Sequence, residues 1–159
     1  RGARSSHKLA SWVQEHGFAA KFHGGPRAGP MLIMPPALEA GFGELGKHGS
    51  LLNRQFGSSL RLAYILTDAP LVADQPDEIG ADGFCTSCQI CTKGCPVDAI
   101  SPEKEMVRGI EKWFVNFDKC ILYFNENNGC AICLAKCPWN KKGTAPKLAE
   151  KLTRRQNRE

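Results

Sequence analysis

The stretch CTSCQICTKGCP, from Cys85 to Pro96, spaces four cysteines at intervals of two, two and three residues. A second and less regular set follows, in which nine residues separate Cys120 from Cys130, and Cys133 and Cys137 come next at the short intervals. Both sets end in Cys-Pro, and together they use all eight cysteines of the 159-residue chain. These spacings restrict the structure more closely than any other part of the sequence.

Cysteines at this spacing are typical of iron–sulfur proteins. Two residues between ligands let a tight loop place successive sulfurs on adjacent corners of one cluster, and the fourth sulfur then points to a neighbouring cluster. The proline that follows fixes φ and donates no hydrogen bond, so the chain turns outward. The crossed pattern predicts two ligand tetrads for two 4Fe–4S clusters. Tetrad 1 comprises Cys85, Cys88, Cys91 and Cys137, and tetrad 2 comprises Cys95, Cys120, Cys130 and Cys133.

Two other uses of eight cysteines compete with this interpretation. Small secreted domains form disulfides, and zinc is usually held by two separated C-x2-C pairs. Neither predicts a third cysteine at the same short interval, nor the Cys-Pro ending of both sets. The pattern therefore favours a two-cluster, ferredoxin-type electron relay, although the long interval after Cys120 makes its assignment the loosest of the eight.

The composition sets wider limits. The length suits one domain, or one small domain plus part of another, and 42% hydrophobic residues make a buried core feasible. The formal charge of +5 counts cysteines as neutral. Because each ligated 4Fe–4S cluster adds roughly two negative charges, the loaded protein should be near neutrality, and the basic excess is weak support for nucleic-acid binding. No apolar run approaches the ~20 residues of a membrane-spanning helix.

The first eighty residues predict only a few short elements. Ser6 is a candidate N-cap for a helix with apolar residues Leu9, Trp12 and Val13 at helical spacing, and Gly17 would end it. Four further elements are expected: a strand at 18–22, a glycine- and proline-rich loop at 24–36, a brief helix at 36–40 and a strand at 60–67. These are too few to cover both faces of a sheet, which indicates part of a larger domain.

Four glycines, at positions 41, 43, 46 and 49, follow in quick succession around Lys47 and His48. Glycine at this density permits unusual backbone angles and close approach of the main chain to a ligand, although a plain surface loop has the same composition. Residues 70–82 are expected to connect to a cysteine module whose halves are separated by a helix or a strand pair at 106–117. The basic tail from Lys141 is expected to be a solvated, partly frayed terminus.

The chain opens at Arg1 with neither a methionine nor a secretory signal, and we expect it to be a piece of a longer protein. The patterns together predict an α+β chain in three segments. These are a partial domain at 1–80, a two-cluster module at 81–140 and a basic tail at 141–159.

Four blocks of the sequence resemble the C-terminal part of a reductive dehalogenase. They are MPPALEAGFGELGKHGSLLN (34–53), SSLRLAYILTDAPL (58–71), the two cysteine sets, and CPWNK (137–141). The resemblance implies that residues 1–80 are the C-terminal part of a nitroreductase-like cobalamin-binding domain, followed by a ferredoxin-like module. It also implies reductive cleavage of a carbon–halogen bond, with electrons passing through two 4Fe–4S clusters to a cobalamin.

A related family, the epoxyqueuosine (tRNA) reductases, shares the cobalamin domain, the paired cluster motifs and the CPWN ending. Two features favour the dehalogenases. The segment GELGKHG (43–49) resembles their loop rather than the Trp-Ile-Gly-Lys-Asn pattern of the tRNA enzymes, and the interval from Cys120 to Cys130 is compact. A non-catalytic two-cluster ferredoxin is a third alternative, from a different class, but it leaves the first eighty residues unexplained.

The resemblance implies roles for individual residues. The residues expected to line the corrin or its nucleotide tail, chiefly through backbone amides, are Gly43, Gly46, Lys47, His48, Gly49, Leu51 and Leu52. His48 is not expected to bind cobalt, because the family leaves cobalt without a lower protein ligand and no Asp-x-His-x-x-Gly motif is present. For Lys47, an ordinary exposed lysine is the alternative.

Arg61 is a candidate for an arginine near the substrate pocket, with a surface strand arginine as the alternative. The family commonly takes its proton from a tyrosine ahead of this region, whereas the first tyrosine here, Tyr64, already lies on a predicted strand. We therefore expect the proton donor upstream of Arg1.

The resemblance also implies partners and location. We expect an organohalide substrate, an electron donor that is either a reductase or a quinol-linked partner, a membrane anchor protein in the respiratory case, and no nucleic acid. Respiratory relatives are exported to the outer face of the cytoplasmic membrane and catabolic ones stay in the cytoplasm, so both locations remain open.

Overall fold

A computed structural model describes residues 2–23 and 29–158. It has an α+β fold, as predicted. The helices are α1 (Gly2–Glu15), α2 (Met34–Glu39), α3 (Ala81–Ser87), α4 (Ile90–Lys93), α5 (Phe117–Glu126), α6 (Ile132–Lys136), the 3-10 helix η1 (Pro138–Asn140) and α7 (Thr144–Gln156). The strands are β1 (Ala20–His23), β2 (Glu44–Leu45), β3 (Leu51–Leu52), β4 (Tyr64–Thr67), β5 (Glu105–Val107) and β6 (Ile110–Lys112). None of the described helices is long and apolar enough to cross a membrane.

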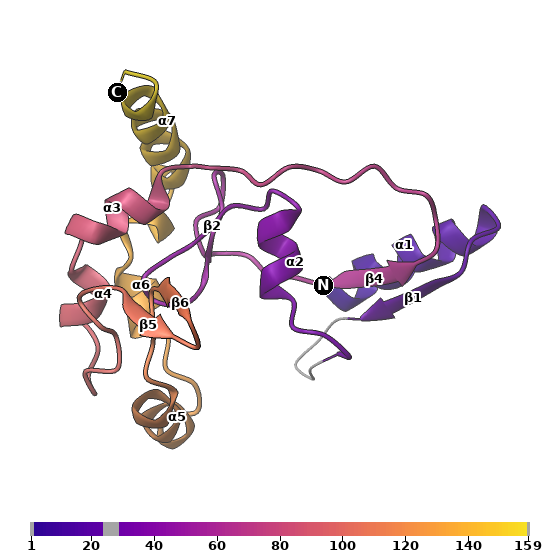
Figure 1. Ribbon diagram of the computed structural model, residues 1–159. Helices are drawn as coiled ribbons and strands as arrows, with labels where there is room; N and C mark the ends of the chain where they lie inside the picture. The colour runs from indigo at the N-terminus through magenta and orange to yellow at the C-terminus, as the bar shows by residue number, and fades with distance from the viewer. Residues whose placement is uncertain (1, 24–28, 159) are drawn as a thin grey trace.

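The molecule has two ends joined by an extended connector (Figure 1). One end holds α1, β1 and β4, and the other holds the cysteine-bearing helices and α7. Residues 68–80 contain no helix or strand and run between the two ends, as the sequence predicts for 70–82. The hairpin predicted as one alternative for 106–117 is present as β5 and β6, which pair through Val107 and Ile110.

At the first end, α1 packs against a two-stranded antiparallel sheet. β1 pairs with β4, from Ala20 opposite Thr67 to His23 opposite Tyr64, so both predicted strands are present but shorter or shifted. The predicted loop at 24–36 lies partly outside the described residues, namely at 24–28. The predicted end of this loop at residue 36 is wrong, because α2 begins at Met34. Prolines occupy the first turn of α2, where a backbone N–H would have no partner within the helix.

The start of α1 corrects one prediction. Ser6 is not an N-cap but lies inside the helix, where its hydroxyl donates to the carbonyls of Gly2 and Ala3, each at 3.1 Å. This back-bonding satisfies a buried hydroxyl that would otherwise lose its hydrogen bonds to water. The predicted end is confirmed, because Gly17 follows the helix at φ 88°, a conformation that glycine adopts without strain.

The apolar face of α1 is rotated from the predicted one. Ala10 and Val13 are buried, whereas Leu9 and Trp12 are 50% and 55% exposed. Helical spacing alone does not say which of two adjacent stripes faces the sheet. Here Ala10 and Val13 face the sheet, because their small side chains let the helix approach the short strands closely.

The glycine-rich segment is a hairpin rather than a simple loop. β2 pairs with β3, with Glu44 opposite Leu52 and Leu45 opposite Leu51. Gly43 has φ 130°, and a Cβ there would overlap the carbonyl oxygen of Leu52, so only glycine fits. The hairpin turn at 46–50 therefore presents Lys47 and His48 from a defined backbone rather than from a flexible loop.

One hydrophobic core links all three predicted segments. Its buried members are Leu52, Ile79, Ala81, Cys85, Trp113, Cys137, Trp139, Ala145 and Ala149. The hairpin, the cysteine module and α7 all contribute to this core, so the core does not separate the three segments. Their division remains a prediction.

The prediction of a partly frayed basic tail is wrong, because most of the tail is helical. Residues 144–156 form α7, which packs on η1 and on α3. Ala145 and Ala149 are only 3% and 0% exposed, and Leu148 and Leu152 pack beside them. This narrow apolar stripe recurs at helical spacing but lies among as many lysines and arginines, so the sequence pattern did not reveal it.

Glu44 holds the hairpin against the cysteine module. Its carboxylate accepts hydrogen bonds from the backbone N–H groups of Ile79, Gly80 and Asp82, at 2.8, 3.1 and 2.9 Å. These donors lie at the start of α3, where helix N–H groups lack intrahelical partners. A side chain 35 residues or more away in sequence thus caps the helix that carries Cys85.

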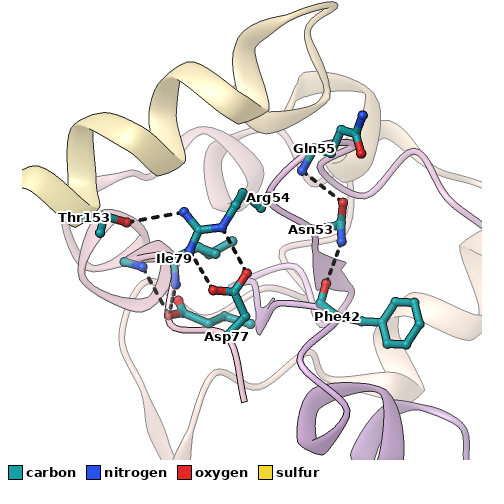
Figure 2. Close-up of polar contacts among 9 residues, drawn as sticks. Phe42, Asn53, Arg54, Gln55, Asp77, Ile79 and Thr153 are labelled. Carbon is teal, nitrogen blue, oxygen red and sulfur yellow. Dashed lines mark hydrogen bonds and ion pairs between the residues drawn. The ribbon is translucent and has the colours of Figure 1, made fainter. Parts of the chain in front are cut away.

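A second polar cluster connects the same regions (Figure 2). Arg54 forms a two-point ion pair with Asp77, at 2.6 and 3.0 Å, and reaches Thr153 of α7 at 3.5 Å. The side chain of Asn53 donates to the carbonyl of Phe42 and accepts from the N–H of Gln55. Because the Arg54–Asp77 pair is partly exposed, we expect it to add little stability by itself and to fix orientation instead.

We predict that Glu44→Ala lowers the free energy of unfolding by about 2 kcal/mol, because three N–H groups at a helix start lose a charged acceptor. Glu44→Gln should cost less, since its amide keeps one acceptor oxygen. Denaturant unfolding of the cluster-loaded protein, followed by circular dichroism, measures both. Glu126→Gln, which changes an exposed carboxylate, is the control. Equal stability of all three variants would contradict the cap.

Candidate iron–sulfur site

All eight cysteines carry free thiols, and those of tetrad 1 lie within short helices or directly after them. Cys85 is in α3 and Cys88 follows it, Cys91 is in α4, and Cys137 follows α6. Burial raises the pKa of Cys85 to about 12, and charge on Cys91, Cys137 and Cys88 adds to the rise. The structure thus brings tetrad 1 together from segments some fifty residues apart, while its ligation of a cluster stays a prediction.

Tetrad 2 is also brought together. Burial raises the pKa of Cys120, and charge on Cys95 and Cys130 contributes to the rise. Burial likewise raises the pKa of Cys133, with contributions from Cys130, Cys91 and Cys95. The irregular Cys120 therefore lies near the partners that the crossed pattern predicts. The influence of Cys91 on Cys133 follows from the packing of α4 against α6, which places the two tetrads side by side.

The backbone affects the charge that these sulfurs can carry. Burial raises the pKa of Cys137 to about 11, and the backbone at Trp139 and Asn140 partly offsets this rise. The N–H of Ala99 donates to the Sγ of Cys95 at 3.3 Å. Such donors stabilise charge on sulfur, and hydrogen bonds to sulfur are one means by which proteins tune cluster potentials. Iron must displace protons from these thiols, so cluster assembly should release protons.

The chemistry of the cysteine side chains suits an iron–sulfur cluster. Among residues 2–23 and 29–158, no three histidine, cysteine or acidic side chains form a group that could hold one metal ion. A 4Fe–4S cluster takes each of its four cysteines on a different iron atom, so its ligands surround a cube rather than a point. Soft thiolates with N–H donors to sulfur are the donor set that such clusters use.

Lys47 is buried rather than exposed, with 1% of its surface accessible. Its Nζ donates to the carbonyls of Cys88 and Pro102, at 3.0 and 2.8 Å, and lies 4.5 Å from the centre of the Trp113 ring. The structure therefore directs Lys47 into the cysteine module. Its predicted contact with a cobalamin stays a prediction.

His48 is also buried, and burial lowers its pKa from 6.5 to about 4, so the imidazole is neutral at physiological pH. Its Nδ1 accepts from the N–H of Ser50 at 3.2 Å, which leaves the proton on Nε2. Within the part of the chain that the structure describes, Nε2 is buried without a partner. An N–H in this position is available to an acceptor outside the described residues.

The other residues predicted at the cofactor differ in burial. Gly43, Gly46, Leu51 and Leu52 are buried, and Gly49 is exposed. Arg61 is exposed and lines a cavity of about 480 Å³ together with Ser50 and Leu51. The structure thus places Arg61 beside the hairpin rather than on β4, which begins at Tyr64.

Three contacts that position the site were missed by sequence reasoning. They are the cap by Glu44, the ring of Trp113 over Lys47, and the side chain of Asn140, which accepts from the N–H of Ser58 at 2.6 Å and donates to Leu134 at 2.7 Å. The asparagine of CPWN was visible as a motif. Its partners were not, because they lie as far as 82 residues away.

Comparisons with known proteins agree with this geometry. Residues 84–141 match the family model described as a 4Fe-4S dicluster domain. A tetrachloroethene reductive dehalogenase of Dehalobacter restrictus is 34% identical over 152 residues, covering 87% of this chain and 27% of the relative. An epoxyqueuosine reductase of Escherichia coli is 33% identical over 151 residues, covering 84% of this chain and 36% of the relative.

Solved structures separate these relatives further. A reductive dehalogenase structure, reported to suggest a mechanism for B12-dependent dehalogenation, matches with a TM-score of 0.80 and 32% identity, over 89% of this chain and 21% of that one. An epoxyqueuosine reductase bound to a tRNA stem loop matches with a TM-score of 0.65 and 22% identity, over 89% and 38%. At that identity, the second match speaks for the fold alone.

Fold, tetrads and dicluster match together define a protein with two 4Fe–4S clusters. The chain spans about a quarter of the length of the curated dehalogenases that it matches. Within that range it is a reductive dehalogenase-like sequence, corresponding to their C-terminal part and related to the epoxyqueuosine reductases.

Paired cysteine substitutions test the crossed ligation. If each cluster draws a ligand from the other set, Cys88→Ala with Cys137→Ala removes two ligands of one cluster, and about four of about eight iron atoms should remain. Cys88→Ala with Cys95→Ala then damages both clusters. Uncrossed ligation gives the opposite result for the two pairs. Iron analysis and electron paramagnetic resonance of anaerobically reconstituted protein distinguish the outcomes.

Proposed function

We propose that this chain is the electron-delivering C-terminal part of a cobalamin-dependent reductive dehalogenase. The observation that carries the proposal is the match to a dehalogenase structure along 89% of the chain at 32% identity, with a higher TM-score than the tRNA enzymes give. The substrate class is an organohalide, and the electron donor is a reductase or a quinol-linked partner. The compact interval between Cys120 and Cys130 supports the same choice.

The hairpin residues fit a cobalamin in two respects. His48 offers a buried N–H that finds no acceptor among the described residues, and Ser50 and Leu51 line a cavity of about 480 Å³. A corrinoid carries amide and phosphate oxygens that accept such hydrogen bonds. When bound, cobalamin supplies a cobalt ion that can be reduced to an electron-rich state and react with an organohalide.

This chain's own residues would deliver and confine the electrons. Tetrad 1 would hold cluster 1 and tetrad 2 would hold cluster 2, and single electrons would pass between these adjacent clusters. Cluster 1 would lie next to the hairpin, because Lys47 contacts Cys88. The core formed by Trp139, Trp113 and Leu52 keeps water from this side of tetrad 1. A dry surrounding with N–H donors to sulfur lets the protein set the cluster potential. The exposed guanidinium of Arg61 would bind an anionic group of the substrate.

The proposal predicts halide release by the longer protein of which this sequence is part. With cobalamin, a strong one-electron reductant and a panel of aryl and alkyl halides, the protein should release halide faster than free cobalamin under the same conditions. Cys88→Ala with Cys137→Ala should lower the rate at least roughly tenfold, because the electron path is broken. No halide from any substrate, with cofactors verified by spectra and metal analysis, would reject the proposal. Clusters without cobalamin retention would indicate a simple electron carrier.

The epoxyqueuosine reductase alternative has one structural observation in its favour. A groove of about 650 Å³ follows α7 and is lined by Lys147, Lys151, Arg154, Arg155 and Arg158. Basic side chains along a groove suit a polyanion, although Glu150 pairs with Arg154 there at 2.6 Å.

We expect no specific tRNA binding at physiological salt. A tRNA-binding surface would give an affinity that falls steeply with salt concentration, because phosphate contacts release counterions. Filter binding of transfer RNA and of an unrelated RNA, between low and physiological salt, measures this. Salt-dependent binding that prefers tRNA and is lost in Lys147→Ala with Lys151→Ala would favour the alternative.

A further inference from the structure

Lys47 contacts or influences three of the four cysteines of tetrad 1. Its Nζ donates to the carbonyl of Cys88 at 3.0 Å. Burial raises the pKa values of Cys85 and Cys91, and the backbone of Lys47 partly offsets the rise at Cys85 while its charge partly offsets the rise at Cys91. The three interactions come from one residue at the tip of the hairpin. The proposed function does not account for them, because it needs only the thiolates themselves.

The ammonium group of Lys47 is buried in an unusual setting. Two carbonyl oxygens and the Trp113 ring surround it, and no carboxylate of residues 2–23 or 29–158 lies within ion-pair distance. Burying a cation is costly unless a negative charge compensates it. Asp82 accepts a hydrogen bond from the indole N–H of Trp113 at 2.9 Å, but it pairs with Lys104 rather than with Lys47.

A cluster in tetrad 1 would supply the missing charge. A ligated 4Fe–4S cluster carries about two negative charges in its oxidised state and gains another on reduction. A fixed cation nearby stabilises the reduced form more than the oxidised form, and more strongly in a low-dielectric interior than in water. Tetrad 2 receives no such contact from Lys47.

We propose that Lys47 is the internal counter-ion of cluster 1 and raises its reduction potential relative to cluster 2. Lys47 is thus a positioning residue that acts through the cluster and does not touch a substrate. Electrons then move downhill from cluster 2, held by the more exposed Cys120 side, to cluster 1 beneath the hairpin. This rests on the two clusters and not on dehalogenation, so it can fail or stand independently of the proposed function.

Potentiometric titration of both clusters, followed by electron paramagnetic resonance, tests the proposal. Lys47→Gln keeps donors for the carbonyls of Cys88 and Pro102 but removes the charge. At a fixed ambient potential, the ratio of reduced to oxidised cluster 1 should fall about tenfold, which equals about 59 mV for a one-electron couple. Cluster 2 should change less than about twofold, since it lies farther from the charge.

Three further variants make the test decisive. Lys47→Arg keeps the charge and should leave the cluster 1 ratio within about twofold of the original. Lys104→Met is the matched control, since Lys104 lies 5.5 Å from the same Trp113 ring but is paired with Asp82 and partly exposed. Lys47→Met removes the charge with an apolar stem, and is used if the buried amide of Lys47→Gln prevents folding.

Each outcome has a defined meaning. A selective fall at cluster 1 in the neutral variants, restored by Lys47→Arg, supports the proposal. Loss of cluster 1 iron in both neutral variants but not in Lys47→Arg also supports it, because the charge is then required for assembly. Three results would overturn the proposal: an unchanged potential of cluster 1 in the neutral variants, an equal shift at both clusters, or loss of cluster 1 iron in Lys47→Gln, Lys47→Met and Lys47→Arg alike.

Discussion

The fold depends on the packing that brings cysteines from distant segments together. In the predicted crossed ligation, Cys137 joins the first cysteine set and Cys95 the second, and the packing of α4 against α6 brings the two sets side by side. Cys85 and Cys137 are also members of the hydrophobic core, beside Trp139 and Ala149. Ligand geometry and apolar packing are therefore satisfied by the same residues, and neither can be arranged without the other.

Around that centre, polar side chains attach the hairpin to the cysteine module. Glu44 caps α3, Asn140 bonds the backbone at Ser58, and Lys47 reaches the loop of Cys88. Each contact joins the segments proposed to meet a cobalamin with the segment proposed to hold cluster 1. A short and rigid connection of this kind would suit electron transfer, because it would fix the distance between a cobalamin and that cluster.

The sequence predicted what is local and missed what is distant. The cysteine spacing predicted both tetrads, because the residues of a cluster-binding loop are nearly consecutive in sequence, and the structure brings their members together. Gly17 marked the end of α1. The burial of Lys47 and the packing of α7 could not be read in this way. A lysine beside glycine looks exposed, and the stripe of Ala145 and Ala149 lies among lysines and arginines, so only tertiary contacts with Trp113 and Trp139 reveal them.

The shared core affects how the protein would respond to oxygen. Two thiols of tetrad 1, those of Cys85 and Cys137, belong to the same core as Leu52 and Ala149, which are fully buried. If oxygen stripped iron from a cluster held there, protonated or oxidised sulfurs would remain inside the hydrophobic core. Damage to the cluster would then also disturb the packing of the core, because Cys85 and Cys137 belong to both. Repair would require the surrounding polypeptide to repack around a new cluster.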